Sequence, residues 1–217
     1  MTQSVQYIDL ERLHPSPTNP RKHFDEEDLE ELAASVAEHG ILQPLVVRPQ
    51  GDDFEIVVGH RRHRAARRAE LGRAPALVRD LDDATVLELQ LVENNQRQDV
   101  SPLEEADAIE ALVTEHGRDP TDIAAKLGRS DSYVSRRRRL ASLVPELRQL
   151  LDDERIGLGG AEVLGQLPIE LQHELATGRL SSERTTYQGE PACWSNGEVQ
   201  WAIQSTTRKL EHACWDL

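Results

Sequence analysis

The chain has 217 residues, enough for one large or two small domains, and a formal net charge of −14 at pH 7. No apolar run approaches the roughly 18–20 residues of a membrane-spanning helix, and the N-terminal residues lack the basic and apolar regions of a signal peptide. We therefore expect a cytoplasmic protein without a membrane partner. Two late cysteines, Cys193 and Cys214, exclude a disulfide framework.

The first third of the chain alternates strands and helices. A strand is expected from Val5 to Leu10, and a helix capped by Asp25 is expected to end at Gly40 in the left-handed conformation. Strand-forming residues run from Ile41 to Arg48, and a turn at residues 50–52 leads into a strand from Phe54 to Val58. An arginine-rich helix to Leu71 follows Gly59, then a strand from Ala76 to Arg79 and a helix from Asp83 to Asn94.

A second, helical unit is expected from the capping box at residues 101–104 to about Leu180. We accordingly predict three regions: residues 1–98, residues 99–180, and a tail of residues 181–217. The tail contains all three tryptophans, which is typical of a small packed element or an interface, and dimerisation is one use for it.

Two arginine-rich segments stand out against the acidic background. Since only Lys22, Lys126 and Lys209 are lysines, 22 of the 25 basic residues are arginine, a composition that resembles proteins of a salt-rich cytoplasm, as in haloarchaea. Seven arginines lie between residues 59 and 79 and five between residues 129 and 140, each group against one acidic residue. These two segments are the candidates for binding phosphate.

The second arginine segment belongs to a predicted helix-turn-helix, from Pro120 to Leu140. A short helix ends at Gly128, Ala124 is placed where the two helices cross, and Val134 anchors the second helix, which Ser130 caps. Arginine and serine side chains can bond base edges or phosphates. Candidate DNA-binding residues are Ser130, Ser132, Tyr133, Ser135, Arg136, Arg137 and Arg139. Arg138 falls at an expected apolar position, so we expect its stem to pack while its head reaches phosphate.

The first arginine segment begins where a strand turns into a helix, at residues 59–65. Free N–H groups and the helix dipole favour an anion there, and Arg61 and Arg62 can bind phosphate oxygens. A second polar cluster, residues 93–97, offers the oxygen donors that Mg²⁺ prefers. From these residues alone, a DNA-backbone contact for the arginine helix and a capping role for Glu93 remain equally open.

The collinear order of these motifs resembles the ParB family of DNA-partition proteins, over about Val5 to Leu180. The motifs are residues 19–21, 40–45, 59–65, 93–97 and 101–106, followed by the helix-turn-helix. The resemblance implies an α+β fold, in which a small mixed α/β nucleotide-binding domain precedes an all-α helix-turn-helix domain. It also implies a homodimer that binds CTP and Mg²⁺, loads on a palindromic DNA site and closes into a sliding clamp, in chromosome or plasmid partition.

Carried over by position, the resemblance assigns roles to particular residues. Gly59, Arg61 and Arg62 would hold the triphosphate, and Glu93 and Asn94 would bind Mg²⁺ and phosphate. The segment with Gly40, Ile41, Gln43 and Pro44 would line the base pocket.

The sequence departs from the family pattern in four places. His60 stands where relatives have glutamate and Asn19 where they have glutamine, both at hydrolysis positions, so we expect slow or altered CTP turnover. Residues 159–162 replace a basic segment that helps to read the DNA site, so the preferred site is expected to differ. No basic residue precedes Arg12, which weakens the expectation of a ParA-type ATPase partner.

Two alternatives stay open. A site-specific transcription regulator would keep the fold without the nucleotide switch. A primary enzymatic role is disfavoured: no cysteine precedes Cys193 for thiol chemistry, and the motifs offer no cluster of carboxylates for a nuclease.

Overall fold

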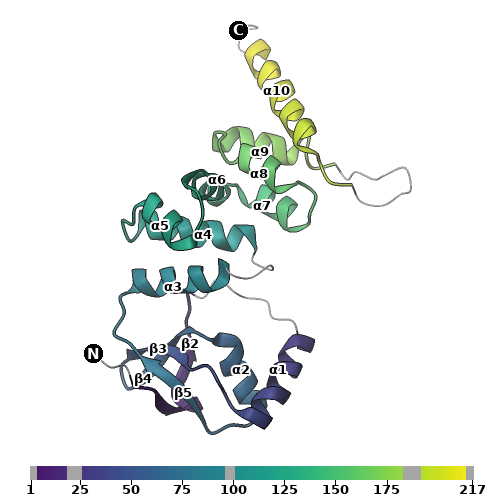
Figure 1. Cartoon of the computed structure of the whole chain (residues 1–217). Coiled ribbons are helices and arrows are strands. Elements are labelled where there is room, and N and C mark those ends of the chain that lie inside the picture. Colours follow the sequence, from purple (N-terminus) through teal and green to yellow (C-terminus); the bar gives the residue numbers. More distant parts are fainter. Residues whose placement is uncertain (1–3, 19–25, 96–100, 183–191, 214–217) are drawn as a thin grey trace. The chain divides into compact units, whose positions relative to one another are not determined.

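A computed structural model of the chain describes residues 4–18, 26–95, 101–182 and 192–213, with side chains described up to residue 207 (Figure 1). The chain forms two compact units. The first comprises Met1–Val100 with Thr114–Arg118, and the second comprises Ser101–Val113 with Asp119–Leu217. The expected α+β class is confirmed, because a mixed sheet with helices precedes a helical unit (Figure 1).

The first unit is built on a five-stranded sheet in the order β1-β5-β3-β4-β2. Strand β1 (Gln6–Asp9) pairs antiparallel with β5 (Arg73–Val78), which runs parallel to β3 (Leu45–Gln50). Strand β3 pairs antiparallel with β4 (Asp53–Val58), and β4 runs parallel to the edge strand β2 (Leu13–Pro15). A short 3₁₀ helix, η1 (Leu10–Arg12), connects β1 to β2.

Three helices complete this unit: α1 (Glu26–His39), α2 (His60–Arg68) and α3 (Asp83–Asn95). Helices α1 and α2 pack against each other, and α3 packs against β4. The core consists of small and branched side chains from the sheet and the first two helices, among them Leu45, Ile56, Leu29, Val36 and Ala65.

The second unit contains helices α4 (Pro102–Thr114), α5 (Pro120–Leu127), α6 (Asp131–Ala141), α7 (Pro145–Asp152), α8 (Leu158–Leu164), α9 (Ile169–Thr177) and α10 (Asn196–Ala213). Its main core joins Leu140 of α6, Leu147 of α7, Leu164 of α8 and Leu175 of α9. Val199 and Ala202 of α10 are fully buried in the same core, so the proximal part of the tail belongs to the packed unit.

Several expected boundaries differ in the structure. The run from Ile41 to Arg48 becomes a strand only at Leu45, because Gly40 adopts a φ of 70° and Pro44 has no N–H to pair. The arginine helix ends at Arg68 rather than Leu71, three residues before its expected end. Strand β2 was not expected, and the predicted cap Asp25 lies outside the described residues. Within the described part of the chain, no helix is long and apolar enough to cross a membrane.

Gly165, at the C-terminal end of α8, tests how closely α8 packs on α6. A β-carbon there would overlap the backbone carbonyl oxygen of Arg139. This atom belongs to the backbone of α6, so it cannot move aside as the end of a flexible side chain could. We expect Gly165→Ala to lower the free energy of unfolding of this unit by roughly 1–3 kcal/mol. Urea denaturation followed by tryptophan fluorescence measures this loss of stability. Every tryptophan lies at or beyond Trp194, so the fluorescence reports on the second unit.

Gly197→Ala is the matched control for this prediction, because a β-carbon at Gly197 meets no atom within 4 Å. Gly197 lies near the start of α10, and its replacement by alanine should leave the free energy of unfolding unchanged or raise it by up to about 1 kcal/mol. An equal loss in both variants would contradict close packing of α8 on α6.

Candidate functional site

The start of α2 is shaped by Gly59, which follows β4 directly. Gly59 has a φ of 105°, and a β-carbon there would lie 2.6 Å from Cδ2 of Leu45 and 3.1 Å from Nη2 of Arg62. A side chain is thus excluded by both the backbone conformation and the lack of space. Glycine lets the chain turn sharply from the strand into the helix. As in any α-helix, the first N–H groups of α2 have no hydrogen-bond acceptor within the helix itself.

Arg62 connects three of the predicted nucleotide-binding segments. Its Nη1 donates hydrogen bonds to the backbone carbonyls of Gln43 and Pro44, the second at 2.8 Å. Burial lowers the pKa of Arg62, while the negative charge of Glu93 on α3 acts to raise it. The structure therefore brings the loop before β3, the start of α2 and the end of α3 to one guanidinium.

Arg61 points to a different partner, on α1. Its Nη2 lies 3.3 Å from Oδ2 of Asp28 and donates to that carboxylate. The two arginines therefore both have partners in the protein, a carboxylate for Arg61 and carbonyls for Arg62. A phosphate that bound both would replace these contacts.

His60 is the first residue of α2. Its Nε2 accepts a hydrogen bond from the backbone N–H of Ser16 at 3.3 Å. Burial, reinforced by the nearby His63 and Arg64, lowers the pKa of His60 to about 4. The ring is therefore neutral at pH 7, and its Nε2 lone pair is already used by the Ser16 N–H.

The remaining predicted residues of this site are placed differently from one another. In the loop before β3, Gly40, Ile41 and Pro44 are half-buried and Gln43 is exposed. Asn94 is buried, with 3% of its surface exposed. Asn19 lies outside the described residues.

The helix-turn-helix is present as expected in helices α5 and α6. Asp119 caps α5, Gly128 ends it with a φ of 64°, and the Ser130 hydroxyl accepts the Tyr133 N–H to cap α6. Ala124 and Val134 are both buried, at 1% and 0% exposed. The two helices pack against each other.

The four consecutive arginines of α6 divide between the inside and the outside of the unit. Arg137 is 8% exposed, and its Nε lies 2.7 Å from Oε2 of Glu105 on α4. Arg138 is half-buried, and its Nε lies 2.7 Å from Oε2 of Glu110, also on α4. The head of Arg138 is thus paired within the protein, and the predicted phosphate contact would have to replace its bond to Glu110.

Tyr133 belongs to the same buried network. Its hydroxyl donates to the Glu105 carboxylate at 2.8 Å and accepts from Nη2 of Arg137 at 2.9 Å. Burial raises the pKa of Tyr133; the hydrogen bond from Arg137 acts to lower it, and the bond to Glu105 acts to raise it, so that the net shift is upward and the hydroxyl stays protonated. Arg137 and Tyr133 were both expected to contact DNA, and their internal bonds argue against that role.

Four predicted DNA-binding residues remain on the outer face of α6. Ser132, Ser135 and Arg136 are exposed and Arg139 is half-buried, and their spacing places them on one side of a helix. Ser130 is exposed but serves as the cap. The candidate DNA face is therefore Ser132, Ser135, Arg136 and Arg139.

Sequence reasoning missed Glu105, Glu110 and Glu162, three carboxylates that pair with arginines of α6. Glu162 on α8 lies 3.5 Å from Nε of Arg136. Helical spacing could have indicated the burial of Arg137, because it follows buried Val134 by three residues and precedes buried Leu140 by three. Its acidic partner, 32 residues earlier, has no such local signal.

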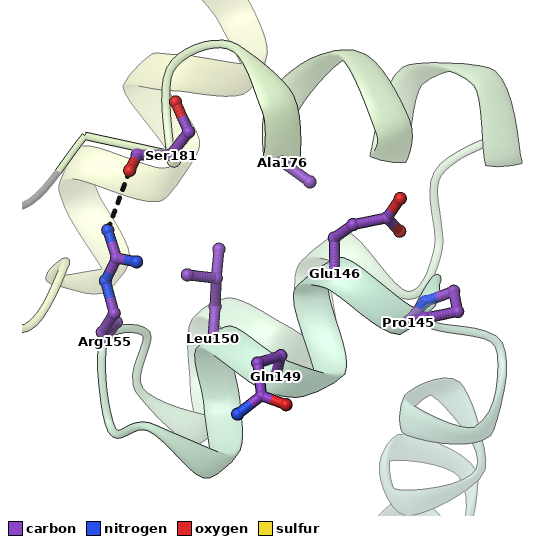
Figure 2. Close-up of a pocket in the computed structure, with 7 residues that line it drawn as sticks. All are labelled: Pro145, Glu146, Gln149, Leu150, Arg155, Ala176 and Ser181. Carbon is purple, nitrogen blue, oxygen red and sulfur yellow. Dashed lines mark hydrogen bonds between the residues drawn. The ribbon is translucent and has the colours of Figure 1, made fainter.

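The helical unit also has a shallow hollow between α7 and α9 (Figure 2). Pro145 and Leu150 line it from α7 and Ala176 from α9, and Arg155 donates to the carbonyl of Ser181 at 3.0 Å at its edge. The residues that line it include none of those predicted for nucleotide or DNA binding.

Comparison with known proteins agrees with this two-part organisation. The family model of the ParB N-terminal domain matches residues 1–95, and that of the ParB HTH domain matches residues 98–191. The chromosome-partitioning protein ParB of Myxococcus xanthus is 37% identical over 220 residues, which cover 94% of this chain and 74% of that protein. The chain belongs to the ParB family.

Other ParB-family proteins are similar over shorter spans. The chromosome-partitioning protein Spo0J of Thermus thermophilus is 47% identical over 163 residues, 75% of this chain and 60% of the relative. This chain thus matches less than two thirds of that relative's length. A crystal structure of C-terminally truncated ParB from Caulobacter crescentus, complexed to the centromeric parS site, aligns with a TM-score of 0.61 and 37% identity, over 81% of this chain and 91% of that one.

Both candidate sites lie within the regions matched by the ParB-family models. The arginine motif of α2 and Glu93 fall inside the N-terminal match, and helices α5 and α6 fall inside the HTH match. The family relationship, stated first as a resemblance of motifs, is therefore confirmed for the whole region in which those motifs occur.

The histidines of α2 predict a pH dependence of local stability. Burial lowers the pKa of both His60 and His63 to about 4, from an ordinary value near 6.5. Unfolding then takes up protons between pH 6.5 and 4, so acidification from pH 7 to 5 destabilises the first unit, by about 2 kcal/mol for each histidine. Hydrogen exchange of α2 and β5 peptides, corrected for intrinsic rates, measures the loss.

His63→Gln should remove roughly half of this pH dependence while keeping a donor for the Leu10 carbonyl, to which His63 bonds. The control is His39→Gln, the same substitution at a side chain that is 56% exposed, which should leave the pH dependence unchanged. Identical pH profiles for the wild type and His63→Gln would contradict the burial of a neutral ring.

Proposed function

We propose that this chain is a DNA-binding partition protein of the ParB type, which binds a specific double-stranded site through α6 and is gated by CTP. The observation that carries the proposal is the 47% identity to a chromosome-partitioning protein, together with an outer face of α6 formed by serines and arginines. The protein would act on a chromosome or plasmid, as a homodimer associated with nucleoid or plasmid DNA. A ParA-type ATPase is a further partner that the family suggests.

The first unit is the proposed nucleotide-binding domain. Gly59 gives a closely packed turn at the start of a nine-residue helix, and Arg61 and Arg62 lie in its first turn. These are features that suit a triphosphate. The loop that Arg62 contacts, with Gln43 and Pro44, would line the base pocket, so a bound nucleotide would exchange with those carbonyl contacts.

Glu93 is the proposed ligand of Mg²⁺. Its carboxylate acts electrostatically on Arg62, and a carboxylate oxygen is a hard donor of the kind that Mg²⁺ prefers, which supports this proposal. The bound metal would neutralise phosphate charge. Asn94, the next residue of α3, is the second proposed ligand.

Hydrolysis of CTP is proposed to be slow or altered. A neutral His60 ring carries no negative charge to hold a metal or polarise water, and its Nε2 accepts the Ser16 N–H. Nucleotide binding would then persist while turnover falls. Phosphate release with DNA, Mg²⁺ and CTP at the ordinary rate of a relative would contradict this part of the proposal.

The function as a whole is tested by retention on closed circular DNA that carries the preferred site, at high salt, with and without CTP and Mg²⁺. We expect CTP-dependent retention that disappears when the circle is linearised, because a closed clamp leaves through a DNA end. Arg62→Ala should weaken CTP binding by roughly tenfold or more, as loss of charged hydrogen bonds predicts, and should abolish retention.

Arg67→Ala is the matched control, since it removes an exposed arginine from the same helix. It should retain CTP binding and clamp closure. DNA binding that is site-specific but unchanged by any nucleotide would contradict the gated clamp and would instead identify a transcription regulator.

A further inference from the structure

The outer face of α6 has one arginine whose charge is balanced from a neighbouring helix. Of the four consecutive arginines, Arg137 and Arg138 are bound by carboxylates of α4. Arg136 lies on the outer face with its side chain 48% exposed, yet Oε2 of Glu162 on α8 lies 3.5 Å from its Nε. A carboxylate therefore stands beside the exposed arginine, on the side of the unit expected to meet a polyanion.

Glu162 is held in place rather than free to move across the surface. Its side chain is only 17% exposed, although its partner is half exposed. Helix α8 also lies close to two other helices. Gly165 packs on the backbone of Arg139 in α6, and a β-carbon at Gly160 would lie 3.1 Å from Cγ2 of Val199 in α10.

The tail helix contributes directly to this placement. A β-carbon at Gly159, in the first turn of α8, would lie 2.6 Å from Nδ2 of Asn196 in α10. Helix α8 is thus packed between α6 and α10, which fixes the direction from which Glu162 reaches Arg136.

We propose that Glu162 is a positioning residue for the reading of DNA sequence. It orients the Arg136 side chain toward a guanine edge and disfavours contacts of Arg136 with phosphates at other sequences. The ion pair is made through Nε, so the two terminal nitrogens of Arg136 are the donors that reach DNA. Paired terminal N–H groups match the O6 and N7 acceptors of guanine. The carboxylate repels phosphates nearby, so non-specific binding loses more free energy than binding of the correct base.

This inference rests on the proposed role of α6 in reading a DNA site. The test uses the full chain. A pool of duplexes with a randomised core gives the preferred site of the wild type, and fluorescence anisotropy at fixed salt then gives the ratio of affinities for that site and for a random duplex. Glu162→Gln should bind the random duplex more tightly and lower the ratio by roughly tenfold, within the range of one arginine–guanine contact.

A double-mutant comparison separates positioning from general packing. In an Arg136→Ala background, Glu162→Gln should have no further effect on the ratio, and Arg136→Ala should lose the preference for guanine at one position of the site. Glu162→Asp should restore most of the ratio because it keeps the carboxylate. Glu170→Gln, the same change of charge at an exposed residue of α9, should leave the ratio unchanged.

An unchanged ratio in Glu162→Gln would overturn the inference while leaving the DNA-reading function intact. An equal effect of Glu162→Gln with and without Arg136 would also overturn it, because the carboxylate would then act through the fold. A wild type that selects no sequence at all would overturn both the site-specific function and this inference.

Discussion

The buried ion pair between Glu105 and Arg137 is the constraint on which the helix-turn-helix half of the molecule depends. Removing a charge from water is costly unless a partner compensates it, and here the compensating carboxylate comes from α4, with the Tyr133 hydroxyl bonded to both groups. This network fixes the rotation of α6 about its own axis. With Arg137 turned inward, helical spacing turns Ser132, Arg136 and Arg139 outward. The direction of one buried arginine thus decides which residues of the helix are available to DNA.

The same kind of pairing bears on how a chain with a net charge of −14 could present the proposed DNA face. Acidic side chains neutralise arginines within the helical unit, since Glu110 binds Arg138 and Asp107 on α4 binds Arg148 on α7. Few arginines then remain for phosphate. Each phosphate contact adds about 0.9 to the slope of the logarithm of affinity against the logarithm of salt concentration. A small number of contacts therefore gives binding that tolerates salt better. Such binding is weak unless base contacts or enclosure of the DNA add to it. A nucleotide-gated clamp and a carboxylate-held arginine both fit that requirement.

Local signals predicted the parts of the fold that short-range chemistry determines. Ser130 caps α6 and Gly128 ends α5 as expected, and the turn at Gly59 starts α2. Sequence could not place β2, because three residues carry too little pattern and the strand forms by parallel pairing with β4, about 40 residues away. Nor could it foresee that α10 packs into the helical core through Val199, or that Glu105 would bury Arg137. Those features depend on contacts between segments that are distant in sequence. A single sequence contains no local pattern that indicates such contacts.

The division of the arginine run is tested most directly by comparing Arg137→Gln with Arg139→Gln, in unfolding free energy and in the salt dependence of binding to a random duplex. The buried pair predicts that Arg137→Gln lowers the free energy of unfolding by about 3 kcal/mol or more and leaves the salt dependence unchanged. Arg139→Gln should change stability by less than about 0.5 kcal/mol and lower the salt slope by about 0.9, the contribution of one phosphate contact. A stable Arg137→Gln variant whose salt slope falls would contradict the account, because Arg137 would then face DNA rather than the core.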